Sequence, residues 1–258
     1  MKNLSILFLA LTLCACDFER FTPWHSHRDG KILVEVREIL GPGKRSLELY
    51  CETEKIFPCS NYQIKTRQKG LDITFKGVEE SDVCLTALGP ATTTLSLPEL
   101  SKGGYSIQLN RDKWVNLGSL VLTEDQIHLD MNYPKGGIKV VRKTTNRVPD
   151  RTYWGTVSYN LPEYEAKMHE YLYKVSQLGA KYNKHLPGDY YYFQIDRDGK
   201  IVQPGENAGF KYGQNFIFQF SGDDTQFRED LKALAKSYSP YLLVRIYDYQ
   251  GGIFDNWS

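Results

Sequence analysis

Apolar and polar side chains alternate along residues 30–143 in short runs that are separated by Gly, Pro, Asn and Asp. A period of two places successive side chains on opposite faces of a β-strand, and the turn residues end each strand. The pattern therefore predicts an antiparallel β-sandwich in which one face of each sheet is in water. We expect its strands at Ile32–Val36, Ser46–Cys51, Tyr62–Thr66, Leu71–Phe75, Thr92–Leu97, Tyr105–Leu109, Leu117–Leu122 and Ile127–Met131.

The pattern changes after residues 144–151, which we expect to be a linker. From Tyr164 to Tyr182 the apolar positions are spaced three and four apart, which is typical of one face of a long helix. Asn160 is the expected cap of this helix, and Asp223 is the expected cap of a second one. The expected strands of this half are Tyr153–Tyr159, Tyr190–Asp196, Asn215–Phe220 and Tyr241–Tyr249.

The order strand, helix, strand, strand, helix, strand predicts a ferredoxin-like α+β domain over residues 152–258. A larger α+β domain that shares its sheet with the first half is the alternative. In the first half, Leu97-Pro98 followed by Gly104-Tyr105 resembles a hairpin of immunoglobulin-like and fibronectin-type domains. This resemblance favours an immunoglobulin-like sandwich over residues 30–143 and implies no function.

The N-terminus has the features of a secretory signal peptide: Lys2 precedes about ten mostly apolar residues, too few to span a bilayer. The segment Leu13-Cys14-Ala15-Cys16 resembles the lipobox of bacterial lipoproteins. That resemblance implies a signal peptide at residues 1–15 and acylation of Cys16, with residues 16–29 as lipid anchor and tether. Several acyl chains hold a protein on a membrane durably. We therefore expect a protein of the bacterial cell envelope, on the inner or the outer membrane.

Three cysteines remain in the mature chain, in a compartment that permits disulfides. Cys51, Cys59 and Cys84 allow one bridge and leave one thiol. Cys51 with Cys59 is the favoured pair because it closes the shortest loop, and Cys59 with Cys84 is the alternative.

The charges of the chain nearly cancel, with 32 Lys and Arg against 31 Asp and Glu. A nucleic-acid partner is disfavoured because binding to the phosphate backbone needs a basic excess. No nucleophile motif, phosphate-binding glycine loop or metalloprotease helix motif is present in the sequence, and His25-Ser26-His27 lies in the expected tether, where no second shell of residues would hold a metal. We therefore expect no catalytic residues, no metal and no cofactor.

Aromatic residues are concentrated in the second half, where 14 of the 18 tyrosines follow Asp150. If Leu242, Val244 and Ile246 face the helices, the period of two places an aromatic set on the opposite sheet face. Tyr, Trp and Arg dominate binding hot spots, so this face is a candidate surface for a protein, peptide or glycan. The alternative is that the face packs on the first domain or on a second copy. Its residues are Trp154, Tyr190, Tyr192, Gln194, Arg245 and Tyr247.

The sequence thus predicts a non-catalytic binding or assembly module, lipid-anchored in the cell envelope, with a homo-oligomer allowed. Two alternatives stay open. One is an envelope hydrolase that acts on glycan or peptide in a cleft between the domains. The other is a structural subunit of an appendage or complex.

Overall fold

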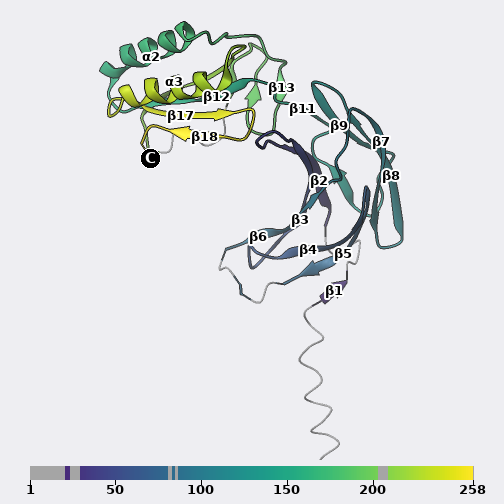
Figure 1. The fold of residues 1–258 in the computed structure, drawn as a ribbon. Helices are drawn as coiled ribbons and strands as arrows, with labels where there is room; N and C mark the ends of the chain where they lie inside the picture. Colours follow the sequence, from purple (N-terminus) through teal and green to yellow (C-terminus); the bar gives the residue numbers. More distant parts are fainter. Residues whose placement is uncertain (1–20, 24–29, 81–82, 85–86, 203–208, 258) are drawn as a thin grey trace, which may run out of the picture. The chain divides into compact units, whose positions relative to one another are not determined.

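The computed structural model describes residues 21–23, 30–80, 83–84, 87–202 and 209–257 (Figure 1). The expected signal peptide and Cys16 lie outside the described residues. The chain divides into two compact units. Unit 1 is Met1–Val36, Glu48–Leu122 and His128–Lys143, and unit 2 is Arg37–Leu47, Thr123–Ile127 and Thr144–Ser258.

The fold is mostly β, and the strands expected in the first half are confirmed. They belong to a large curled sheet with the strand order β10-β2-β3-β6-β4-β5-β7-β8-β9-β11, in which β1 also pairs with β5 (Figure 1). The bounds are β1 Phe21–Pro23, β2 Ile32–Ile39, β3 Ser46–Phe57, β4 Gln63–Lys69, β5 Asp72–Glu79, β6 Gly89–Ser96, β7 Gly103–Arg111, β8 Trp114–Leu122, β9 Gln126–Met131, β10 Ile138–Val140 and β11 Thr144–Asn146.

The connection between β9 and β10 explains why this sheet curls. β9 lies near one edge of the sheet, whereas β10 pairs with β2 at the other edge. Only residues 132–137 join them, and six residues span at most about 22 Å. The two edges must therefore approach each other. The side chains on the inner face of the curl, such as Leu49, Ile73 and Ile107, are fully buried.

The expectation of a purely antiparallel arrangement is wrong at three pairings. β4 runs parallel to β6, β5 runs parallel to β7, and β10 runs parallel to β2. The β4–β5 hairpin lies between β6 and β7, so each of its strands meets a neighbour that is not adjacent in the chain. Alternation identifies strands, but it does not specify which strands become neighbours.

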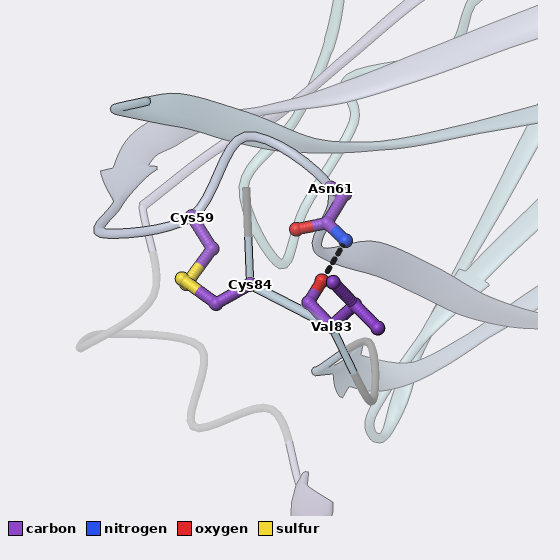
Figure 2. The surroundings of a disulfide bond; sticks show 4 residues. All are labelled: Cys59, Asn61, Val83 and Cys84. Carbon is purple, nitrogen blue, oxygen red and sulfur yellow. Dashed lines mark hydrogen bonds between the residues drawn. A yellow bond between two sulfur atoms is a disulfide. The ribbon is translucent and has the colours of Figure 1, made fainter. Parts of the chain in front are cut away.

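The disulfide joins Cys59 to Cys84, so the favoured pairing of Cys51 with Cys59 is wrong (Figure 2). Cys51 is fully buried within β3, where its side chain faces the core. Cys59 lies in the loop after that strand, beside the segment that holds Cys84. The Asn61 side chain donates a hydrogen bond to the Val83 carbonyl and fixes the same two loops together (Figure 2).

Unit 2 contains a second, four-stranded antiparallel sheet with the order β16-β12-β17-β18. Its strands are β12 Thr152–Tyr159, β16 Tyr212–Gln219, β17 Leu243–Asp248 and β18 Ile253–Asp255. One face packs on the helices α2 (Glu165–Gln177) and α3 (Asp224–Ser237). Leu242, Val244 and Ile246 lie in this core, as the alternation predicted.

The two helices differ in how well the sequence located their ends. Asp223 caps α3 as expected, because its carboxylate accepts hydrogen bonds from the amides of Thr225 and Gln226 at 3.0 and 3.2 Å. Asn160 does not cap α2, which is preceded by a 3₁₀ turn at Pro162–Tyr164. The first long helix also ends earlier than expected, before Gly179, whose φ of 98° is left-handed.

The strand expected at Tyr190–Asp196 is wrong, and this changes the architecture of unit 2. Tyr191 has a φ of 69°, which interrupts an extended strand. A separate small sheet forms instead, from β13 (Gly188–Asp189), β14 (Gln194–Ile195) and β15 (Ile201–Val202). We call residues Tyr190–Ile195 the aromatic segment. It packs on the sheet face opposite the helices, around Trp154 and Ile217.

Replacing Cys59 and Cys84 together by Ser is expected to lower the free energy of unfolding by about 3.5 kcal/mol, because the bridge restricts the unfolded chain over a separation of 25 residues. Urea unfolding of the full chain with and without reductant measures this loss. Cys51→Ala is the control and should keep the parent's response to reductant. A non-reducing peptide map that links Cys51 to Cys59 or Cys84 would contradict the pairing.

Candidate functional site

The sheet face that carries the predicted aromatic set is covered by residues of unit 2 itself. Trp154 on β12 is 2% exposed, and Tyr190 is 3% exposed. Phe193 lies 5.1 Å from the Trp154 ring and 4.8 Å from the Tyr190 ring, between ring centroids. The Tyr190 hydroxyl donates to the Leu186 carbonyl at 2.9 Å, and burial raises its pKa to about 12. The packing of Tyr190 and Phe193 against Trp154 thus holds the aromatic segment on the sheet.

The other four predicted residues are also engaged within this unit. The Tyr192 hydroxyl accepts a hydrogen bond from the Leu40 amide at 3.0 Å, and the Tyr247 ring stacks on Trp154 at 5.9 Å. Gln194 is exposed and donates to Asp189 at 3.2 Å. Arg245 lies 3.7 Å from Asp255 of β18 with about half of its side chain exposed. The structure thus does not bring the six together as one open surface.

Covering the face leaves the outer edge of the sheet free along β16. Lys181 and Gln219 exchange both backbone hydrogen bonds at this edge, at 2.8 and 2.9 Å. Backbone groups alternate in direction along an antiparallel strand. The N–H and C=O groups of Gly213, Asn215 and Ile217 therefore also point away from β12. Among the described residues, β16 has no strand partner on this side beyond the Lys181 bridge.

A groove of about 890 Å³ follows this free edge, which we call the β16 groove. Its floor is the edge strand, and α2 with the segment after it forms one wall. The turn around Gly199 forms the other wall. The aromatic, apolar and charged side chains of the walls are Leu172, Tyr173, Tyr182, Lys184, Asp198 and Lys200.

The walls of the β16 groove combine accessible aromatic surface with charge. Tyr173 is 65% exposed and Tyr182 is 51% exposed. The Tyr182 ring also packs edge-on against Phe218 of the helix-side core, 6.1 Å between ring centroids. The Tyr182 hydroxyl donates to the Leu172 carbonyl at 3.2 Å, and partial burial raises its pKa. Among the described residues of the lining, Lys184 and Lys200 stand against one carboxylate, that of Asp198, which gives these residues a small positive excess.

The sequence did not reveal the β16 groove. In it, Lys200–Gln214 joins two expected strands by more residues than a hairpin needs, which is compatible with a functional loop or with an extra hairpin. Ile201–Val202 pairs with β14, while residues 203–208 lie outside the described residues. One usable signal was Gly179, which ends the helix and places Tyr182 beyond it.

A cluster of charged side chains lies where α3 begins, and it is a candidate site for acid catalysis. The Arg228 Nε donates to Asp224 Oδ2 at 2.8 Å, and its Nη1 donates to Asp248. The Tyr153 hydroxyl also donates to Asp224. Asp248 Oδ1 in turn accepts the amide of Gly252 at 2.9 Å. The cluster therefore ties α3 to β12 and to the end of β17.

The charges of this cluster favour a structural role over acid catalysis. Burial alone would raise the pKa of Asp224, but the hydrogen bonds from Tyr153 and Arg228 outweigh it and hold that pKa below its usual value. Burial, followed by the hydrogen bond to Asp224, raises the pKa of Tyr153. A general acid at neutral pH needs a carboxyl group with a raised pKa. Asp224 has the opposite shift.

Comparisons with protein-family models, with curated proteins and with solved structures found no match for this chain. In the part of the chain that the structure describes, no three His, Cys, Asp or Glu side chains gather as metal ligands. None of the described helices has the length and apolar character needed to cross a bilayer.

Arg228→Met is expected to lower the free energy of unfolding by about 2–3 kcal/mol at pH 7, because it leaves Asp224 and Asp248 partly buried without their cation. The pKa of Asp224 is lower in the folded chain than in the unfolded chain, so the ionised carboxylate stabilises the fold. This contribution to the free energy of unfolding is fully present above the unfolded pKa of about 3.9, and it is lost as the pH falls through the folded pKa.

Urea unfolding between pH 2.5 and pH 7 measures both effects. Lys232→Met, which removes an exposed pair with Glu229 on the same helix, is the control and should cost less than about 1 kcal/mol. An Arg228→Met variant as stable as this control would contradict the role of the cluster.

Proposed function

We propose that this chain is a lipid-anchored binding module of the cell envelope that accepts an extended polypeptide along the free edge of β16. The observation that supports this most directly is the row of outward-pointing backbone groups at Gly213, Asn215 and Ile217. An extended peptide adds a strand to such an edge through main-chain hydrogen bonds. Gly213 has no side chain, which leaves its backbone accessible to a partner.

Backbone pairing alone would bind weakly and without selectivity. Each such hydrogen bond contributes only about 0.5–1.5 kcal/mol net, and three residues offer few of them. The walls of the β16 groove supply the remainder. Tyr173 and Tyr182 offer apolar ring surface, and Lys184 and Lys200 favour acidic side chains over basic ones. We therefore propose an extended partner segment with apolar and acidic residues.

The envelope location is part of the proposal and rests on the lipobox-like segment that ends at Cys16. The Cys59–Cys84 disulfide supports an oxidising compartment, since such bridges are rare in the cytosol.

We likewise propose that unit 2 has a ferredoxin-like fold. The order β16-β12-β17 matches the third, first and fourth strands of that fold. The second strand of that fold would pair with the outer edge of β16, where among the described residues only Lys181 pairs. The β16 groove is that vacant place. The single curled sheet of unit 1, with its parallel neighbours, gives no comparable support to an immunoglobulin-like sandwich.

Gly213→Pro is expected to weaken peptide binding at least tenfold, because proline removes one outward N–H while the pairing of β16 with β12 is kept. The probe is a library of random 12-residue peptides displayed on phage and selected on the full chain. Selected peptides are then titrated by fluorescence anisotropy.

The matched control is Gly213→Ala, which keeps the N–H and should bind within about twofold of the parent. Tyr173→Ala should weaken binding through the loss of wall contact. Peptides that bind Gly213→Pro and Gly213→Ala equally well would contradict strand addition at β16.

A further inference from the structure

The N-terminal strand marks one end of unit 1. β1 pairs with β5 at its C-terminal end, where Phe21 lies opposite Glu79, and Glu79 also lies opposite Gln63. The loop that holds Cys59 comes just before β4, and the segment that holds Cys84 comes just after β5. β7 is parallel to β5, so the β7–β8 turn leaves the sheet at the same end (Figure 1). We call the described residues of the disulfide loops (58–62, 83–84 and 87–88), this turn and residues 132–137 the N-terminal rim.

Exposed apolar side chains gather on this rim. Ile56, Val83 and Leu88 lie on and around the disulfide loops and are 55%, 68% and 77% exposed. Figure 2 shows Val83 next to Cys84. Val115 and Tyr133, near the β7–β8 turn, are 62% and 93% exposed. Isolated exposed apolar residues are normal, but a group at one end of a unit indicates an interaction surface.

The other end of the same strands has a different character. There, the turn around Gly70 and the segment before β7 expose polar and charged side chains, such as Lys69, Glu99 and Lys102. In the described part of unit 1, Leu117 and Val141 are the large apolar side chains exposed elsewhere. The apolar surface is therefore polarised toward the end where β1 lies.

The rim also contains aromatic rings beside lysines, a combination suited to a membrane–water interface. The Trp114 ring has Lys113 Nζ at 5.4 Å and Lys135 Nζ at 5.3 Å from its centroid. Phe57 and Tyr62 stack at 4.9 Å, with Lys55 Nζ 5.1 Å from the Phe57 ring. Aromatic rings lie at the headgroup level, and lysine stems extend their charge toward water.

The sequence before β1 leads to this rim. Four residues lie between Cys16 and Phe21, and the five Cα-to-Cα steps from one to the other span at most about 18 Å. If Cys16 is acylated, the lipid therefore lies within that distance of the strand that pairs at Glu79. An anchor so short keeps the N-terminal rim near the headgroups.

We propose that the N-terminal rim of unit 1 docks on the surface of the membrane that holds the anchor. This rests on the lipid anchor in the proposed function, but not on peptide binding in the β16 groove. Asp112 is next to Lys113 in the chain, and Glu79 lies 3.5 Å from Lys65 of β4, so carboxylates offset part of the lysine charge at this end. Apolar contact and not headgroup charge therefore drives the proposed docking.

The acylated full chain in vesicles of phosphatidylcholine and phosphatidylglycerol, with and without brominated acyl chains, tests this proposal. All chains contain Trp24→Phe, so that quenching of the residue nearest the anchor is removed. The measured quantity is the tryptophan emission that is lost when the vesicles contain brominated acyl chains. Adding Leu88→Trp should raise this quenched emission about twofold, because it places a further indole at the membrane surface, and adding Trp114→Phe should lower it. Lys69→Trp, an exposed site at the opposite end of unit 1, is the control and should leave it unchanged.

Flotation of the same vesicles separates the two possible failures. Chains that float, but whose quenched emission is the same for all variants, would contradict docking by the rim and leave the anchor intact. Chains that do not float would contradict the anchor itself, and the docking with it. The peptide titration is independent of both results.

Discussion

The packing of the aromatic segment on Trp154 is the interaction on which the architecture of unit 2 depends. Tyr190, Phe193 and Ile195 bury a sheet face that would otherwise expose Trp154 and Ile217 to water. Burying a large side chain contributes about 1.5–3 kcal/mol, so this cluster outweighs the few backbone hydrogen bonds of an edge strand. The chain after α2 therefore crosses to the face and does not extend along β16.

This choice has a consequence for function, because one segment cannot cover the face and also pair along the edge. Among the described residues, the backbone groups along the outer edge of β16 have no strand partner beyond the Lys181 bridge, and they lie in a groove that has aromatic and basic walls. Exposed edges are a hazard for soluble proteins, and short strands, charges or covering loops usually protect them. In the described residues, the protection at β16 is limited to the Lys181 bridge at one end. We interpret the edge as a binding surface for that reason.

The sequence predicted the regular parts of the fold well, because period and capping are local properties. Alternation located the strands of unit 1, and the side chain of Asp223 marked the start of α3. Alternation misled at Tyr191, Phe193 and Ile195, which have the spacing of one strand face. In the structure Tyr190 and Phe193 are buried together, and the left-handed backbone at Tyr191 joins them.

The remaining errors concern contacts between distant segments. Loop length favoured Cys51 as a disulfide partner, but β3 directs that side chain into the core, while Cys59 lies in the loop that meets Cys84. The β16 groove was not predictable either, since it exists only because a strand expected next to β16 packs elsewhere. Its residues come from α2, the turn at Gly199 and β16, which no sequence motif connects.

Hydrogen exchange of the β16 amides, followed by NMR on the full chain, tests the free edge most directly. The account predicts alternation along the strand: the amides of Gln214, Phe216 and Phe218, which point to β12, are protected, and those of Gly213, Asn215 and Ile217 exchange at least about a hundredfold faster. Equal protection of both sets would show that another strand already occupies the edge, and would contradict the account.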